Sequence, residues 1–508
     1  MIATYNLIKE KLFNKTLLAV IIVNAINIAT GMGQGFSAIL LPQLENSKEF
    51  FISQEEKSWI ASLGVILNPL GALSAGILMQ FAGRRYTLVG ACVPFCVGWL
   101  VIALSNSLTM LYLGRLLSGI GMGENGERRV RLHIRDQSDS REGAHSSFGP
   151  TGTSFGVLIV YFLGYIINWK TVAGICAATT AVNASLIFLM PETPSWLVSR
   201  KRYPEALESL QWLRRNEIVA KKELDDIVSH TIIESQLAGK KPRTVLDILR
   251  KATVWKPTVI LVCFFILQQG SGIYIMLFYS VTVFQRIEST LNPFVDSIVV
   301  SIVRLLTCII GSGFIQVFGR KRLVVLSSSG MFVSMIMLFV YGNVTDGVEA
   351  SSRFIPWFPE FCLLINISFS MFGTLQLPWI MIGELYPLAY RGIMGGFISS
   401  IGYSLIFLHV KIFPALSTVM NIYSLFLLYG MFSFVSIIFG KLYLPETKDK
   451  EFHEIEDIFR KAKAHPAHTV DKTSDKPDQL SIFVCNPNLP IVLPQVQPIV
   501  VSIPPVVT

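Results

Sequence analysis

Two consecutive amides, Gln268 and Gln269, interrupt an otherwise apolar stretch of the chain. An amide both donates and accepts hydrogen bonds, as a ligand hydroxyl does, so the pair suits the wall of a binding site. Trp379 follows Pro378 in another apolar stretch, where the ring can stack on a ligand and the proline can break the helix. Membrane Gln side chains also join neighbouring helices, and a Trp can simply pack. The residues alone leave both interpretations open.

A second group of residues is charged and stands at the ends of apolar stretches. It comprises Arg84, Arg85, Arg115, Glu192, Arg320, Glu384, Arg391 and Glu446. Such residues can fix the orientation of membrane spans, or form ion pairs that are made in one conformation and broken in another. One exposed pair contributes only about 0–1 kcal/mol, but a network made in one state shifts a balance of a few kcal/mol. We favour the second alternative and predict a cytoplasmic gate.

Catalytic chemistry is not expected of this chain. It has no nucleophile–base set, no phosphate-binding loop and no cluster of metal ligands, so we predict no enzyme, no metal site and no cofactor. Six of the seven cysteines lie in or beside apolar stretches without CxxC spacing. That pattern indicates packing residues.

The elements that must position these side chains are membrane spans. Hydrophobic residues make up 52% of the chain and charged residues 15%, and the apolar residues occur in runs long enough to cross a bilayer. We predict twelve spans, six on each side of a polar region: 17–41, 59–81, 87–105, 109–123, 156–168, 171–190, 258–285, 295–318, 323–342, 359–382, 393–415 and 423–444. The backbone must satisfy its hydrogen bonds within the lipid, so the fold class is an all-α membrane protein.

The chain also contains an internal repeat. Pro191–Thr193 recurs as Pro445–Thr447, and Gly83–Arg85 resembles Gly319–Lys321, at offsets of 254 and 236 residues. This predicts two six-helix bundles related by a parallel repeat, with a substrate site between them near the membrane midplane. The predicted parts are a first bundle at 1–197, a cytoplasmic helical linker at 198–257, a second bundle at 258–450 and a mostly disordered cytoplasmic tail at 451–508.

The net charge of +9 indicates orientation rather than an acidic partner. Lys and Arg gather in the segments that lie inside if the N-terminus is cytoplasmic, as the positive-inside rule requires. We therefore predict a multi-pass plasma-membrane protein with both termini in the cytoplasm, a lipid bilayer around it and no nucleic-acid partner. Asn343 begins an Asn-Val-Thr sequon in an outside loop, which is either a glycosylation site or a chance match. The oligomeric state is not predicted.

One stretch does not fit this scheme. Residues 124–147 carry ten charged side chains, five of them Arg, and a central Arg costs a membrane helix about 2.5 kcal/mol or more. The repeat offsets place a counterpart of Glu384 at about 130–148, where none is recognisable. A reading-frame error across 124–154 is one explanation, because Arg131–Gln137 can be encoded so that a one-nucleotide shift gives Val-Tyr-Ile-Ser-Glu-Ile. A genuine divergent loop is the other. We expect 124–147 not to form a regular span.

In combination, the motifs resemble those of the sugar porters of the major facilitator superfamily. They are Gly83-Arg-Arg, Pro191-Glu-Thr-Pro-Ser-Trp-Leu, Gln268-Gln-Gly-Ser-Gly-Ile-Tyr, Gly383-Glu-x-x-Pro-x-x-x-Arg-Gly and Pro445-Glu-Thr-Lys. The resemblance covers about residues 17–460, and Gly31-Met-Gly-Gln-Gly-Phe-Ser looks most like the insect facilitated trehalose transporters. The fourth-span motif of the family, Val-Tyr-Ile-x-Glu-Ile-Ser, matches the frame-shifted translation and not the printed residues.

The resemblance implies which side chains contact the substrate. The implied sugar contacts are Gln268, Gln269, Tyr274, Trp379, Tyr403 and Gln34. Tyr274 stands where many family members have Asn, which fits a different or larger sugar. The charged residues at span ends would join the two halves in the outward-open state. The first-half counterparts of Glu384 and Arg391 that the resemblance implies are missing from this chain.

The implied activity is facilitative uniport of a small-molecule sugar, trehalose or a hexose, by alternating access. Proton coupling needs a titratable group at mid-membrane. Proton-coupled family members have an acid in the first span, but 17–41 has no Asp or Glu, and the charged Arg304 and Lys411 lie in the second half. The alternatives are a proton-coupled sugar symporter, a non-transporting sugar sensor, and a chain made inactive by its fourth span.

Overall fold

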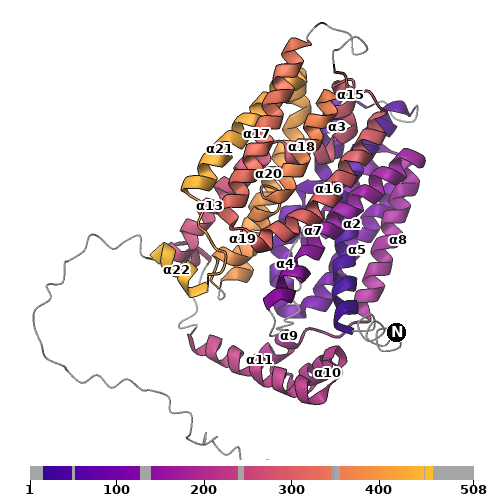
Figure 1. The fold of residues 1–508 in the computed structure, drawn as a ribbon. Coiled ribbons are helices and arrows are strands. Elements are labelled where there is room, and N and C mark those ends of the chain that lie inside the picture. The colour runs from indigo at the N-terminus through magenta and orange to yellow at the C-terminus, as the bar shows by residue number, and fades with distance from the viewer. Residues whose placement is uncertain are drawn as a thin grey trace, which may run out of the picture. The chain divides into compact units, whose positions relative to one another are not determined.

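The computed structural model describes the chain from residue 15 to residue 460, apart from 48–51, 126–138, 215, 238–244, 346, 348–354, 388–389 and 451. All regular secondary structure in this part is helical (Figure 1). Ten helical segments within it are long and apolar enough to cross a membrane. Helices α2 and α6 coincide with the first and fourth predicted spans. The all-α membrane fold is therefore confirmed.

The described residues of the first half form α2 (Lys15–Asn46), α3 (Gln54–Ile66), α4 (Asn68–Ala82), α5 (Arg84–Ala103), α6 (Leu108–Asn125), α7 (Asp139–Ile166) and α8 (Trp169–Phe188). Helix α2 packs against α7 and α8, and α5 packs against α6 and α8. Gly31 and Gly156 permit the crossing of α2 and α7, because a Cβ at either would overlap a backbone carbonyl of the other helix. Small residues at such crossings are typical of membrane helices.

The second half contains α13 (Ala252–Gly270), α14 (Ile273–Phe278), α15 (Ser280–Arg286), α16 (Pro293–Val317), α17 (Arg320–Val344), α18 (Phe358–Phe372), α19 (Leu377–Leu385), α20 (Arg391–Val419), α21 (Ile422–Leu442) and α22 (Phe452–Arg460). Two predicted spans are broken helices. The first breaks at Gly272, whose φ of +76° is left-handed and favours glycine. The second breaks between Gly373 and Gln376, just before Pro378. Broken membrane helices commonly line substrate sites.

Helices α9 (Pro194–Ser199), α10 (Tyr203–Arg214), α11 (Glu217–Leu237) and α12 (Val245–Leu249) join the halves. The first three share a small core of their own, and Leu213 of α10 packs with Ile22 and Leu88 at the base of the first half. We call the end of the bundle that carries α9–α11 the linker end and the opposite end the far end (Figure 1).

The halves meet through pairs of helices that the repeat relates. Helix α7 packs against α16, α3 and α4 pack against α20, and α2 contacts α14 and α15. In the repeat, α7 corresponds to α20, and α3 with α4 corresponds to α16. The two principal contacts between the halves are thus equivalent, as two bundles related by a parallel repeat require.

The charged stretch at 124–147 is described only in part. Helix α6 ends at Asn125 and α7 begins at Asp139, so the first two residues and the last part of the stretch are helical. The segment of α7 that is long and apolar enough to cross a membrane is Gly149–Ile166. Residues 126–138 lie outside the described part.

Candidate functional site

The two glutamines lie in the last turn of α13, directly before the break at Gly272. Gln268 donates from Nε2 to the backbone oxygens of Thr374 and Leu375, both at 2.9 Å. Gln269 donates to Oε1 of Gln268 at 3.2 Å, and its own Oε1 is buried without a partner among the described residues. Gln268 thus holds one broken helix against the other, while Gln269 keeps a free acceptor.

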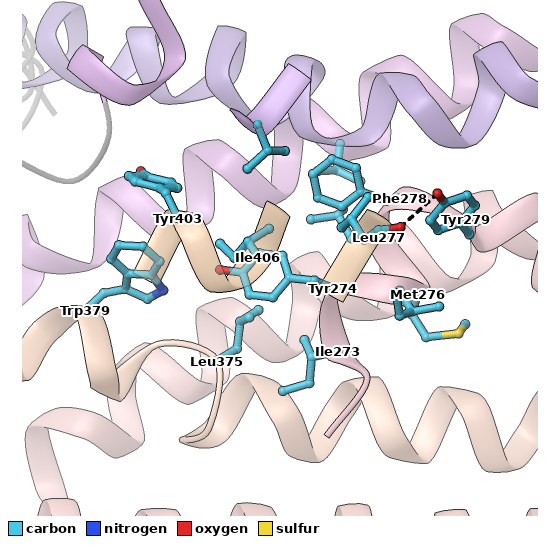
Figure 2. Packing of buried hydrophobic residues seen from close by; sticks show 14 of the residues in the cluster. Ile273, Tyr274, Met276, Leu277, Phe278, Tyr279, Leu375, Trp379, Tyr403 and Ile406 are labelled. Atoms are coloured by element: carbon cyan, nitrogen blue, oxygen red, sulfur yellow. Dashed lines mark hydrogen bonds between the residues drawn. The ribbon is translucent and has the colours of Figure 1, made fainter. Parts of the chain in front are cut away.

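Three aromatic side chains converge beside these amides. Trp379 of α19 lies 4.8 Å from Phe265 and 5.1 Å from Tyr403 of α20, measured between ring centroids. Figure 2 shows Tyr274 of α14 beside Ile406, with Trp379 and Tyr403 a short way along the same cluster. All of these come from the second half. Gln34, the candidate from the first half, lies half-buried on α2.

A chain of polar contacts runs from this cluster to the interface between the halves. Gln376, which precedes α19, donates to Sγ of Cys308 at 3.4 Å, and Thr151 of α7 lies 4.0 Å from the same sulfur. One turn along α16 from Cys308 is Arg304, which is buried with its Nε unpaired. Sequence reasoning noted Arg304 as a charge in a span but gave it no role, and it missed Gln376 and Cys308.

The charged motifs of the second half form a compact cluster at the linker end. Glu446 accepts from the backbone N–H of Arg320 at 2.9 Å and of Lys321 at 3.2 Å. It therefore caps α17, where the positive end of the helix dipole favours an anion. The Arg320 guanidinium instead pairs with Glu384 at 2.8 and 3.3 Å, and Thr447 donates to the same carboxylate at 2.5 Å.

The first half repeats the cap. Glu192 accepts from the backbone N–H of Arg84 at 3.0 Å and of Arg85 at 3.1 Å. Gly83 has a φ of +90°, and a Cβ there would overlap the Glu192 carboxylate, so the turn depends on glycine. The guanidinium of Arg85 lies 5.0 Å from the ring of Phe188. A counterpart of Glu384 is predicted at about 130–148, in a stretch that is only partly described.

Two members of the predicted gate lie apart from these clusters. Arg115 is buried in the first half, where it donates to the Ile60 carbonyl at 3.1 Å and to the Ser37 hydroxyl. It joins α6 to α3 and α2 rather than standing at a span end. Arg391 donates to the Tyr386 carbonyl at 3.2 Å at the start of α20. Within the described residues, the eight charged residues therefore form two capped helix starts, one of which includes the Arg320–Glu384 ion pair, and two separate arginines.

Several side-chain contacts join the halves at the far end. Tyr161 of α7 donates to the Leu277 carbonyl at 2.7 Å, and Ser58 of α3 donates to the Lys411 carbonyl at 3.2 Å. The ammonium group of Lys411 lies 3.6 Å from the ring centroid of Trp59. Lys411 therefore contacts the first half near the far end. It ties α20 to α3.

The fold and these motifs define a secondary membrane transporter of the major facilitator class. The chain belongs to the sugar (and other) transporter family, whose sequence model matches residues 18–459. Among solved structures, it is similar to the proton:xylose symporter XylE bound to 6-bromo-6-deoxy-D-glucose, at 19% identity and a TM-score of 0.70, over 88% of this chain and 100% of that one. A likeness at this identity concerns the fold alone.

Curated relatives point to the same family. The chain is 29% identical over 446 residues to the facilitated trehalose transporter Tret1 of Drosophila willistoni, covering 86% of this chain and 50% of the relative. It is 27% identical over 452 residues to Tret1 of Apis mellifera ligustica, covering 88% of each chain. The chain therefore spans about half the length of the fruit-fly relative and most of the length of the honeybee one.

Proposed function

We propose that this chain is a facilitative sugar carrier that works by alternating access, with trehalose or a hexose as its substrate. The observation that carries the proposal is the meeting of two broken helices, α13–α14 and α18–α19, at an unpaired buried amide oxygen and an aromatic cluster. Hydrogen-bonding groups beside aromatic faces suit a polyhydroxylated ligand with apolar C–H faces. Membership of the sugar transporter family supports the same conclusion.

In this proposal Gln269 receives a sugar hydroxyl at its free Oε1, and Trp379 and Tyr403 stack on the sugar ring. Tyr274 and the half-buried Gln34 complete the wall from the second and first halves. Gln268 has a different part in the conformation described here, because both of its hydrogen bonds from Nε2 hold the α18–α19 break. Gln268 would therefore hold the site in shape and would not donate a hydrogen bond to the sugar.

Alternating access requires contacts that close one end while the other opens. At the far end, the hydrogen bond from Tyr161 and the Lys411–Trp59 contact join the halves. At the linker end, the Arg320–Glu384 pair is complete within the second half. We propose that the charged clusters of the linker end exchange partners between the halves when that end closes.

The remaining assignments are part of the same proposal. We place the chain in the plasma membrane with the linker end and both termini in the cytoplasm, the first bundle at 1–197 and the second at 258–450. The positive-inside bias supports this orientation. Asn343 is exposed at the far end of α17 and is proposed as a glycosylation site, since that end would face outward.

Uptake into proteoliposomes that contain the purified full chain tests the proposal. We expect labelled trehalose or glucose to equilibrate across the membrane at a rate that neither a sodium gradient nor a protonophore changes. The acidic residue of α2, Glu45, is not placed for proton coupling. It pairs with Lys57 at 2.5 Å at the far end and does not lie at mid-membrane. Flux that collapses with a protonophore would identify a symporter, and sugar binding without flux would identify a sensor.

A further inference from the structure

Arg304 lies near the middle of α16, the twelfth of its 25 residues. It shares the buried face of that helix with Ser297, Ser301 and Cys308, at helical spacing. The residues on the opposite face, such as Leu306 and Ile310, are more than half exposed on the outside of the bundle. The arginine therefore faces the first half and cannot extend along α16 to the membrane surface.

The guanidinium of Arg304 has no counter-charge among the described residues. It makes no ion pair with a described carboxylate, and its Nε is buried without a hydrogen-bond partner. The groups within electrostatic range are the hydroxyls of Tyr161 and Tyr274 and the thiol of Cys308. All three are neutral side chains. A buried charge is normally paired or bound to a ligand, because leaving it uncompensated costs several kcal/mol.

The arginine adjoins the proposed sugar site. Cys308, one turn away, accepts from Gln376, and the two residues before Gln376 accept from Gln268. Tyr274, which is within electrostatic range of Arg304, belongs to the same buried cluster as Trp379 and Tyr403 (Figure 2). A ligand seated against the aromatic cluster would thus extend one end toward the guanidinium.

We infer that Arg304 binds an anionic group of the transported sugar, a carboxylate or a phosphate, and that the carrier prefers such sugars to neutral ones. The inference rests on the proposed sugar-carrier function. An arginine presents a planar set of N–H donors that matches a carboxylate or phosphate in bidentate geometry. Hydrogen bonds between charged partners are about twice as strong as neutral ones, and the ligand would supply the counter-charge that the protein lacks.

Ligand binding to the purified full chain in detergent tests this inference without requiring transport. Thermal unfolding and isothermal titration would compare glucose, trehalose, glucuronate, glucose 6-phosphate and inorganic phosphate. We expect glucuronate or glucose 6-phosphate to bind about 10- to 100-fold more tightly than glucose. The two anionic sugars distinguish a carboxylate site from a phosphate site.

Two variants assign the preference to Arg304. Arg304→Gln should bring the affinities for charged and neutral sugars together, and Arg304→Lys should retain part of the difference. The matched control is Arg322→Gln, which removes the same charge from an exposed position of α17 and should leave the ratio unchanged. Without ligand, Arg304→Gln should unfold at the same or a higher temperature, because it removes an uncompensated charge.

Several results would overturn the inference. Equal affinity for glucose and glucuronate, or a ratio that Arg304→Gln leaves unchanged, would show that the arginine does not select an anion. Inorganic phosphate binding as tightly as glucose 6-phosphate would show an anion site without sugar selectivity. A large loss of stability in unliganded Arg304→Gln would assign the residue to packing. If no sugar binds at all, the proposed function fails as well, whereas glucose binding without charge preference leaves that function intact.

Discussion

Arg320 has two acidic neighbours in the structure, and double-mutant cycles can show that they act on different parts of it. Glu384 contacts the side chain, through two hydrogen bonds of 2.8 and 3.3 Å. Glu446 contacts the backbone N–H, at 2.9 Å. Substitution of Arg320 by Ala removes the guanidinium but leaves the N–H. The side-chain coupling should therefore appear with Glu384 and not with Glu446.

The expected magnitudes follow from burial and geometry. The side chains of Arg320 and Glu384 are 15% and 18% exposed, which places this pair between an exposed pair of about 0–1 kcal/mol and a buried one. We expect a coupling energy of about 1–3 kcal/mol for Arg320 with Glu384. For Arg320 with Glu446 we expect a side-chain coupling energy of less than about 0.5 kcal/mol. That is the deviation from additivity found for mutations at sites that do not interact.

The single substitutions at Glu446 provide a further check. Glu446→Ala leaves the first N–H groups of α17 without their acceptor, and loss of a cap costs about 0.5–2 kcal/mol. Glu446→Gln should cost less, because the amide retains one oxygen that can accept from the N–H of Arg320. Equilibrium unfolding in mixed detergent micelles, followed by tryptophan fluorescence, measures each free energy. A coupling to Glu446 as large as that to Glu384 would refute the assignment of Glu446 as a helix cap.

Three other predictions concern the site and the two ends. Gln269→Ala should weaken sugar binding by about 1–3 kcal/mol at unchanged stability, whereas Gln268→Ala should lower the unfolding temperature. Titration measures the first effect and thermal unfolding the second. The reverse pattern would contradict the hydrogen-bond assignment. Trp59→Ala should loosen the far end, because it removes the Lys411 contact, and should raise the labelling rate of a cysteine placed there; Lys411→Met should have the same effect, and a rate unchanged in both would exclude a closing role. Replacing 124–154 by the frame-shifted translation should increase sugar uptake at equal expression, and transcript reads that confirm the printed codons would reject the frame explanation.

Much of the fold could be predicted because the bilayer constrains it strongly. Apolar runs of span length can only be helices there, and the recurrence of Pro191–Thr193 as Pro445–Thr447 indicates which helices correspond. The break before Pro378 could be anticipated from the proline, whereas the break at Gly272 was not predicted within the span 258–285. Helix α7 was placed too late, because a charged helical segment outside its apolar part has no hydropathy signal.

The contacts of the charged residues were harder to predict. A carboxylate that follows a span can bind a guanidinium or a backbone N–H, and residue types do not separate the two, so Glu192 and Glu446 were expected in ion pairs. The buried position of Arg115 could not be predicted, because its hydrogen-bond partners, Ser37 and Ile60, lie on other helices and the local sequence does not indicate them. The burial of Arg304 could be anticipated only from its place in an apolar run. The roles in sugar contact stay predictions.

The two helix caps have a consequence for biosynthesis. Glu192 reaches back 108 residues to the backbone N–H of Arg84, and Glu446 reaches back 126 residues to that of Arg320. Because domains generally fold in order as the chain emerges from the ribosome, the first closure can form before any of α13–α21 is made. The second must wait until almost the whole membrane part is complete. In a nascent chain released before Glu446, the start of α17 would lack its cap. Such a chain would present a folded first half and an incompletely folded second half to quality-control proteases.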